Sequence, residues 1–325
     1  MSELSGPGLW TTSVGSFPKP DYIKKARSRF ARGEVDRDEL KRLEQQATRE
    51  WIEFQNSIDT DLVVDGEMYR GDMVAFFAEE LPGLEIGGLV RSYGNRYYRK
   101  PIATGPVSRD KPLTVEWWKY AQALTDKPVK GMLTGPYTIC DWSFNEHYAT
   151  RRDFVLDVAK VIRDEALDLE RAGARYIQID EPAASTRMDE LDLVIEAMAV
   201  VTEPLSAHTI THICYGDFHN AYPKMLDIPV DHIDLEFANS DYALLEEFGE
   251  HPFTKYVGFG VVDVHSHREE SIDEIADGIR KGLKHFPADR MFVDPDCGLK
   301  TRTVEEAKSK LANIKKAVDI VRAEL

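Results

Sequence analysis

The segment Thr211-His212-Ile213-Cys214-Tyr215-Gly216 places an imidazole and a thiol two residues apart in an apolar run that predicts a buried β-strand. Side chains at positions i and i+2 of a strand lie on the same face of the sheet. His212 and Cys214 are therefore predicted to reach the same ion. Two further potential ligands stand at the ends of later apolar runs, Glu236 at the end of one and Cys297 just after another.

These four residues form a set of one histidine, two cysteines and one glutamate. Imidazole and thiolate ligands suit Zn²⁺, and ligands gathered from separate strand ends are typical of a catalytic zinc site rather than a zinc knuckle. The alternative is a core histidine beside two buried free thiols, since free cysteine is among the most buried residue types.

Composition and charge limit the classes of protein. With 325 residues, of which 42% are hydrophobic and 30% charged, the chain is typical of globular proteins with one large domain or two small ones. A formal net charge of -16 argues against nucleic acid and anionic membranes as partners. The three cysteines, an odd and sparse set, argue against a disulfide framework. The start has no targeting signal and no stretch is long and apolar enough to span a membrane, so we expect a cytoplasmic protein.

Short apolar runs alternate with helical patterns along the whole chain. The expected strands are residues 9–14, 61–65, 129–134, 175–179, 209–214, 232–236, 256–262 and 291–293. Eight β-then-α units predict a (β/α)₈ TIM barrel in a single domain over residues 1–325, because parallel strands need helical crossovers.

The helical patterns carry their own boundary signals. Apolar residues from Leu40 to Ile58 recur every three or four positions, and a second such pattern over 154–169 is expected to end at Gly173. Ser271 with Glu274, and Thr303 with Glu306, have the spacing of capping boxes that open a helix.

Residues 69–111 interrupt the alternation with glycine, proline, tyrosine and arginine. They predict a hairpin or long loop inserted between strands 2 and 3. Long loops in compact domains are often functional. A substrate-facing flap and a solvated hairpin with its arginines in water are both compatible with this composition.

Reactive side chains follow the predicted strands at their carboxyl ends, where active sites of barrel enzymes lie. Because these side chains gather at the strand ends, a metal site is favoured over the alternative of unrelated histidines and cysteines buried in the core. The residues are Ser16, Glu67, Asp180, Glu181, His212, Cys214, Glu236, Asp263, His265 and Cys297.

Motifs along the entire chain resemble those of the cobalamin-independent methionine synthase family, in the same order. The resemblance covers only the C-terminal catalytic barrel of the long family members, which carry a second, N-terminal barrel. The motifs are Thr12-Ser13-Val14-Gly15-Ser16-Phe17-Pro18, Gly66-Glu67-Met68, Gln178-Ile179-Asp180-Glu181-Pro182, His212-Ile213-Cys214, Asp263-Val264-His265-Ser266 and Asp294-Pro295-Asp296-Cys297-Gly298.

The resemblance implies a zinc-dependent methyltransferase that methylates the thiol of L-homocysteine to give L-methionine. It implies that His212, Cys214, Glu236 and Cys297 bind Zn²⁺. A metal-bound thiol loses its proton, and this agrees with the need for a nucleophile at neutral pH.

The same resemblance implies residues for the substrates. Glu67 and Asp180 would bind the homocysteine ammonium, the backbone around Ser16 its carboxylate, and Trp142 would stack on the methyl donor. Glu181 has either a supporting or a structural role. Cys140 is expected to be a small buried hydrophobic residue.

The expected methyl donor is methylcobalamin or a methylated corrinoid protein, because the N-terminal barrel that helps bind folate in long members has no counterpart here. The alternative is 5-methyltetrahydrofolate, whose departing nitrogen needs a proton. His265 matches the acid for that step, with Asp263 expected on the same strand face. The basic residues Arg91, Arg96, Arg99 and Lys100 would then receive the folate tail.

Three other classes remain. A related zinc-thiol alkyltransferase would act on another thiol such as coenzyme M. A zinc hydrolase is disfavoured by two cysteine ligands. The third class is a non-catalytic corrinoid or thiol carrier.

Overall fold

The computed structural model describes residues 4, 6–91, 97–214, 221–249 and 251–325. The chain divides into two compact units. One contains Met1–Tyr69, Trp117–Lys130 and Ile233–Leu325, and the other contains Arg70–Glu116 and Gly131–His232. The organisation as a single domain stays a prediction. Among the described residues, no helix is long and apolar enough to cross a membrane.

Strands of the first unit follow the order β1-β10-β9-β8. Strands β1, β10 and β9 run parallel, with Trp10 opposite Phe292 and Val293 opposite Phe259. Their carboxyl ends therefore face the same way. The strands are β1 (Trp10–Thr11), β10 (Met291–Asp294), β9 (Tyr256–Gly260) and β8 (His232–Leu235).

The expected strand 61–65 is present only as isolated parallel bridges, Val63 with Val129 and Ser16 with Gly66. Leu62 donates to the carbonyl of Thr11 on one side, while on the other side Lys130 donates to the carbonyl of Val63. The segment lies in a strand position, but its ladders are too short to form a regular strand.

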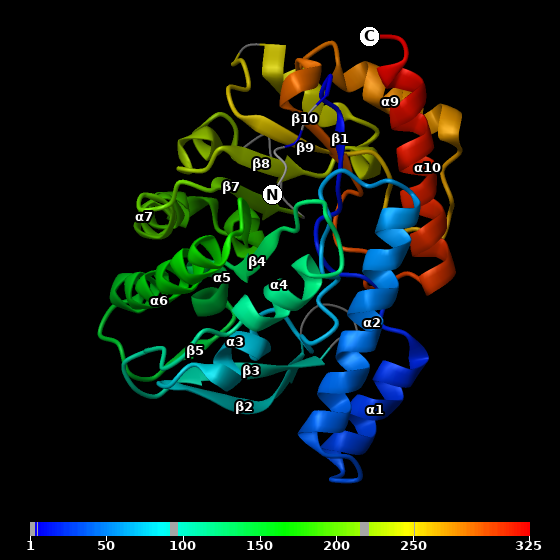
Figure 1. Ribbon diagram of the computed structural model, residues 1–325. Helices are drawn as coiled ribbons and strands as arrows, with labels where there is room; N and C mark the ends of the chain where they lie inside the picture. The colour runs from blue at the N-terminus through cyan, green and yellow to red at the C-terminus, as the bar shows by residue number, and fades with distance from the viewer. Residues whose placement is uncertain (1–3, 5, 92–96, 215–220, 250) are drawn as a thin grey trace. The chain divides into compact units, whose positions relative to one another are not determined.

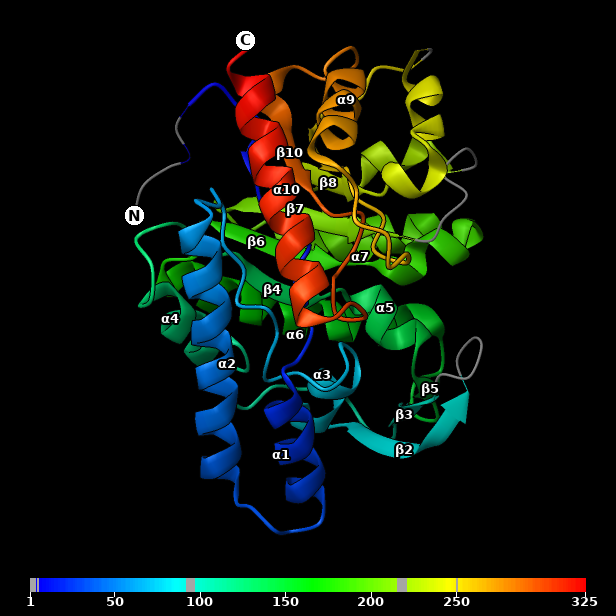
Figure 2. The same cartoon turned by 90° about the vertical axis from the view of Figure 1, so that its right-hand side faces the viewer.

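Helices of the first unit show the boundaries that the sequence predicts. Both capping boxes are present, Ser271 with Glu274 and Thr303 with Glu306. Helices α9 and α10 lie side by side, as do α1 and α2 (Figure 1, Figure 2). The helices are α1 (Asp21–Ala31), α2 (Arg37–Ser57), α9 (Ile272–Gly282) and α10 (Val304–Arg322), with α4 (Val115–Gln122) at the boundary between the units.

The second unit contains parallel strands in the order β7-β6-β4, with Thr134 opposite Asp180 and Ile177 opposite Thr209. Helix α6 ends at Gly173, whose φ of 110° is the left-handed cap that the sequence predicts. The elements are β4 (Gly131–Thr134), α5 (Pro136–Asp141), α6 (Arg151–Ala172), β6 (Tyr176–Asp180), α7 (Leu191–Thr202) and β7 (His208–Ile213).

The insert predicted over 69–111 forms the short helix α3 (Ala75–Glu80) and a hairpin of β2 (Leu84–Arg91) and β3 (Tyr97–Ala103). A third strand, β5 (Phe144–Asn145), extends this sheet in parallel with β3 (Figure 2). The sequence did not predict β5, because a two-residue strand has no periodicity. Arg96 lies outside the described residues, so the basic cluster expected for a folate tail stays a prediction.

Candidate metal centre and substrate site

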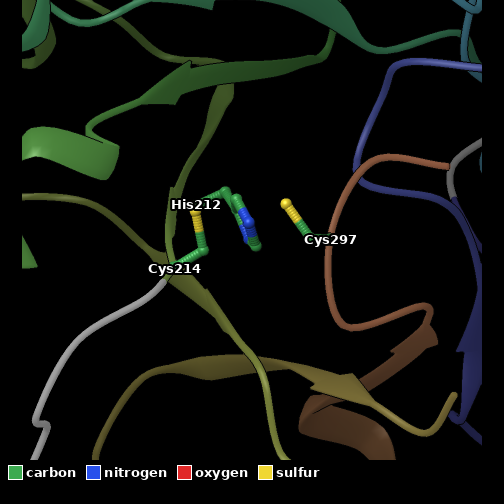
Figure 3. Close-up of side chains that lie close together, drawn as sticks. All are labelled: His212, Cys214 and Cys297. Atoms are coloured by element: carbon green, nitrogen blue, oxygen red, sulfur yellow. The ribbon is translucent and has the colours of Figure 1, made fainter. Parts of the chain in front are cut away.

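His212 lies near the end of strand β7, and Cys214 is the first residue after the strand. Both side chains are buried, 3% and 5% exposed. One ligand atom from each of His212, Cys214 and Cys297 lies within 4.8 Å of the others. Figure 3 shows the three side chains together, with that of Cys297 extending toward the other two. Tyr215 and Gly216, which end the motif, lie outside the described residues.

The donor chemistry of this group fits zinc. None of the three cysteines, all of which lie in the described part of the chain, forms a disulfide, so Cys214 and Cys297 keep the sulfur atoms that bind zinc as thiolates. One imidazole nitrogen and two thiolate sulfurs are a set of donor atoms that zinc sites use.

Glu236 follows β8 and is 4% exposed. It is not in the close group that the described residues form. Its carboxylate accepts a hydrogen bond from the side chain of Asn239, and its Oε2 lies 3.8 Å from Nε2 of His265. Its role as the fourth ligand stays a prediction.

His265 and Asp263 lie in a turn after the end of β9, and not on one face of a strand as expected. The carboxylate of Asp263 accepts the backbone N–H of His265 at 2.7 Å, which is the hydrogen bond of an Asx turn. The neighbouring carboxylate of Glu236 raises the pKa of the His265 imidazole. This favours the protonated imidazole, the form that donates a proton.

A buried lysine of α10 anchors the His265 turn. The Nζ of Lys310 donates to the carbonyl oxygens of Asp263, at 3.0 Å, and Arg268, at 2.5 Å. It also lies 2.6 Å from the carboxylate of Glu270, which accepts the backbone N–H of Asp263. The sequence gives no sign of this role for Lys310, because a lysine in an amphipathic helix normally points to solvent.

Ser16 and Glu67 come together in the first unit through the bridge between Ser16 and Gly66. Gly66 and Glu67 have φ values of 77° and 58°. Left-handed backbone is unfavourable for a glutamate, and such strain concentrates at functional sites. The carbonyl of Ser16 also accepts the backbone N–H of Leu299 at 2.8 Å, which links this strand end to the segment after Cys297.

Asp180 is the last residue of β6 and Glu181 follows it, and the two carboxylates lie in different environments. Asp180 is 8% exposed and accepts a hydrogen bond from Gln178 at 2.8 Å. Glu181 is fully buried, and its carboxylate accepts the backbone N–H groups of Tyr137 and Thr138 at the start of α5. Burial raises the pKa of Glu181 to about 7. Its oxygens are therefore engaged in holding α5, a structural role.

Helix α5 carries both remaining residues of interest. Trp142 is the C-terminal cap of the helix and is partly exposed, which keeps its ring available to a ligand. Cys140 is 1% exposed, and burial raises the pKa of its thiol well above the usual range. Cys140 is therefore the small buried residue that the sequence predicts.

Comparison with known proteins places this site in a family. The sequence profile described as "Cobalamin-independent synthase, Catalytic domain" matches residues 9–319. The chain belongs to this family. Over 338 residues it is 42% identical to the 5-methyltetrahydropteroyltriglutamate--homocysteine methyltransferase of Rhodococcus jostii (strain RHA1), covering 100% of this chain and 45% of that relative. The enzyme of the same name from Streptococcus suis (strain 05ZYH33) is 39% identical, with 99% and 45% covered. The chain thus spans about half the length of the curated relatives it matches.

Solved structures of the family agree with the barrel prediction. The B12-independent methionine synthase from Shewanella sp. W3-18-1, in complex with selenomethionine, has a TM-score of 0.87 and 30% identity, with 98% of each chain covered. A protein from Listeria monocytogenes, described as a putative B12-independent methionine synthase, has a TM-score of 0.77 and 21% identity, which shows the fold alone. The chain has the TIM-barrel-like α/β fold of this family.

The comparisons correct the expected methyl donor. The family is described as cobalamin-independent, and the relatives are named for a methyltetrahydropteroyltriglutamate donor. A methylcobalamin or corrinoid-protein donor is therefore not supported, and the folate alternative is favoured.

Proposed function

We propose that the protein is a zinc-dependent methyltransferase that moves a methyl group from a methylated tetrahydrofolate to the thiol of L-homocysteine, forming L-methionine. The observation that carries this proposal is the buried group of His212, Cys214 and Cys297 in a chain of the cobalamin-independent family. Two thiolates in one metal site disfavour a hydrolase, because catalytic zinc hydrolases use mostly histidine and carboxylate ligands.

His212, Cys214 and Cys297 would hold the zinc, and Glu236 would complete the set while its Oε2 keeps the hydrogen bond from Asn239. When bound, the ion supplies a deprotonated homocysteine thiol at neutral pH. With two thiolates and a carboxylate as ligands, the site would carry net negative charge. This charge would favour attack of the homocysteine sulfur on an electrophilic methyl group.

The amino-acid end of homocysteine carries an ammonium, which needs anionic partners, and a carboxylate, which needs hydrogen-bond donors. The carboxylates of Glu67 and Asp180 would bind the ammonium, and backbone N–H groups near Ser16 would bind the carboxylate. The strained backbone at Glu67 supports this assignment, because residues held in left-handed backbone are concentrated at functional sites.

The methyl group leaves a ring nitrogen of the donor as the S–C bond forms and the N–C bond breaks. The nitrogen then carries the electron pair and takes a proton. His265 would donate that proton, since it is a neighbour of Glu236 and the Lys310 anchor holds its turn. Trp142 would stack on the flat ring of the donor.

The test supplies the purified protein with zinc, homocysteine and one of two donors, 5-methyltetrahydropteroyltriglutamate or methylcobalamin, and measures methionine. Coenzyme M replaces homocysteine in a parallel reaction. We expect methionine from the folate donor and no turnover of coenzyme M.

Each other outcome has a defined meaning. Methionine from methylcobalamin alone would overturn the donor assignment. Methylation of coenzyme M in preference to homocysteine would overturn the acceptor. An absence of methyl transfer with either donor and either thiol would overturn the proposed function.

A further inference from the structure

Asp296 directly precedes Cys297, and its carboxylate binds the backbone that directly follows Glu236. Its Oδ1 accepts the N–H groups of residues 237 and 238, each at 3.0 Å, and its Oδ2 accepts that of residue 239 at 2.7 Å. The residue is fully buried. A single side chain therefore joins the two segments of the first unit that carry proposed zinc ligands.

The same network continues to the ligand side chain. Asn239 gives its backbone N–H to Asp296 and its side-chain amide to the carboxylate of Glu236. The backbone of Asp296 is fixed in turn, because its N–H donates to the carbonyl of Val262 at 3.0 Å. The position of Glu236 thus depends on Asp296 through two successive hydrogen bonds, both donated by Asn239.

Gly260, the last residue of β9, leaves the space that Asp296 occupies. A Cβ at Gly260 would lie 2.2 Å from Oδ1 of Asp296 and 2.8 Å from its Cα. Both distances are far below van der Waals contact. Any larger residue at position 260 would therefore push the carboxylate away from its three donors.

We infer that Asp296 is a positioning residue that sets the spacing of Glu236 and Cys297 for zinc binding without itself touching the metal. The inference rests on the proposed zinc site. Carboxylates that orient metal ligands from behind typically change metal affinity by about 10–100-fold when they are replaced. Asp296 acts on the ligands through the backbone that follows one and precedes the other.

Asp296→Asn is the sharpest test, because it preserves volume and removes one acceptor. If the amide oxygen takes the place of Oδ1, its NH₂ group faces the N–H of Asn239, and two donors then oppose each other. Zinc affinity is measured by competition with a chromophoric chelator, with no substrate present. We expect a loss of roughly 10–100-fold.

Glu165→Gln is the matched control. Glu165 lies within α6, is fully buried and accepts the backbone N–H groups of Leu113 and Thr114 at 2.7–3.0 Å. It has the same capping chemistry but adjoins no proposed ligand. We expect this variant to lose stability and to keep wild-type zinc affinity. Wild-type affinity in folded Asp296→Asn, or an equal loss in both variants, would overturn the positioning role.

A second pair of variants moves the carboxylate without changing any charge. Gly260→Ala is expected to weaken zinc binding, while Gly282→Ala, whose Cβ would meet the flexible end of Met291 and the ring of Phe259, is expected to strain the fold alone.

If Asp296→Asn fails to fold, hydrogen exchange of the wild-type amides at 237–239 decides. Protection that increases with zinc supports the role, and free exchange with zinc bound overturns it. A wild-type protein that binds no zinc would instead overturn the proposed function itself.

Discussion

The Nε2 atom of His265 lies 3.8 Å from Oε2 of Glu236, so the proposed acid and a proposed zinc ligand are direct neighbours. This separation is too long for a hydrogen bond but short enough for strong attraction between the charged groups. The carboxylate cannot serve His265 and a metal ion equally well. Binding of zinc at Glu236 would therefore leave the imidazole more ready to release its proton.

His265→Gln should lower the rate of methionine formation from methylfolate by about 10²–10⁴-fold, the usual contribution of a general acid. The zinc content should stay at the wild-type level, because His265 is not among the proposed ligands. His267→Gln is the matched control, since His267 is exposed and bonds to Glu306 at 2.8 Å. Equal rates for wild type and His265→Gln in single-turnover measurements would exclude His265 as the acid.

Cys297→Ala should abolish stoichiometric zinc binding, because it removes one of two thiolates from a group within 4.8 Å. Cys140→Ala removes a thiol that is 1% exposed and is no part of that group, so its zinc content should not change. Elemental analysis of the dialysed proteins measures both. Retention of zinc in Cys297→Ala would refute the assignment of this residue.

Local patterns predicted most of the fold. The spacing of Ser271 and Glu274 and the glycine at 173 act within one helix, so sequence alone gave both helix boundaries. The pair His212 and Cys214 was likewise predictable, because strand geometry links neighbours i and i+2. In contrast, 61–65 was expected as a strand, and only its tertiary partners show that its pairing is reduced to single bridges.

Contacts between distant residues account for what the sequence did not predict. The turn of His265 depends on Lys310, which is 47 residues from Asp263 in the chain. The bond between Asp296 and residue 237 spans 59 residues. No periodicity in the sequence links residues that are so far apart in the chain. The aspartate before Cys297 was visible in the motif, but its role depends on backbone groups that no side-chain pattern marks.

Asp180→Asn should weaken homocysteine binding by about 1.5–3 kcal/mol, the usual contribution of a hydrogen bond to a charged group. Zinc content should not change. Asp189→Asn, at an exposed position of the same unit, is the control for loss of one negative charge. Calorimetric titration of the zinc-loaded proteins measures the affinity. Unchanged binding by Asp180→Asn would indicate that the natural thiol lacks an ammonium group.

Lys310→Met should lower the free energy of unfolding by about 3–5 kcal/mol, because it leaves the buried carboxylate of Glu270 without its cation. The double variant Lys310→Met/Glu270→Gln should be less destabilised than the sum of the two single variants. Urea unfolding of all four proteins measures this coupling. Additive single effects would show that the pair contributes nothing beyond its separate contacts.

The buried imidazole of His208 should make the free energy of unfolding depend on pH. The residue begins β7, its ring lies against those of Tyr176 and His232, and burial lowers its pKa to about 4 although the charge of Asp231 opposes this. In the unfolded chain a histidine has a pKa near 6.5. Between these values the unfolded state binds more protons, so acid favours unfolding. Stability is complete above about pH 6.5 and falls toward pH 4, by up to roughly 3 kcal/mol from this residue.

The His208→Gln variant removes this titration, so its loss of stability between pH 7.5 and pH 5 should be smaller than that of the wild type. We expect the two losses of unfolding free energy to differ by about 2 kcal/mol. The reason is that pH 5 lies about 1.5 units below the unfolded pKa and each unit contributes about 1.36 kcal/mol. His285→Gln, at an exposed position, should lose as much stability between the two pH values as the wild type. Urea unfolding at both pH values measures the free energy of unfolding of each protein. Parallel curves for wild type and His208→Gln would show that His208 is protonated equally in the folded and unfolded chains.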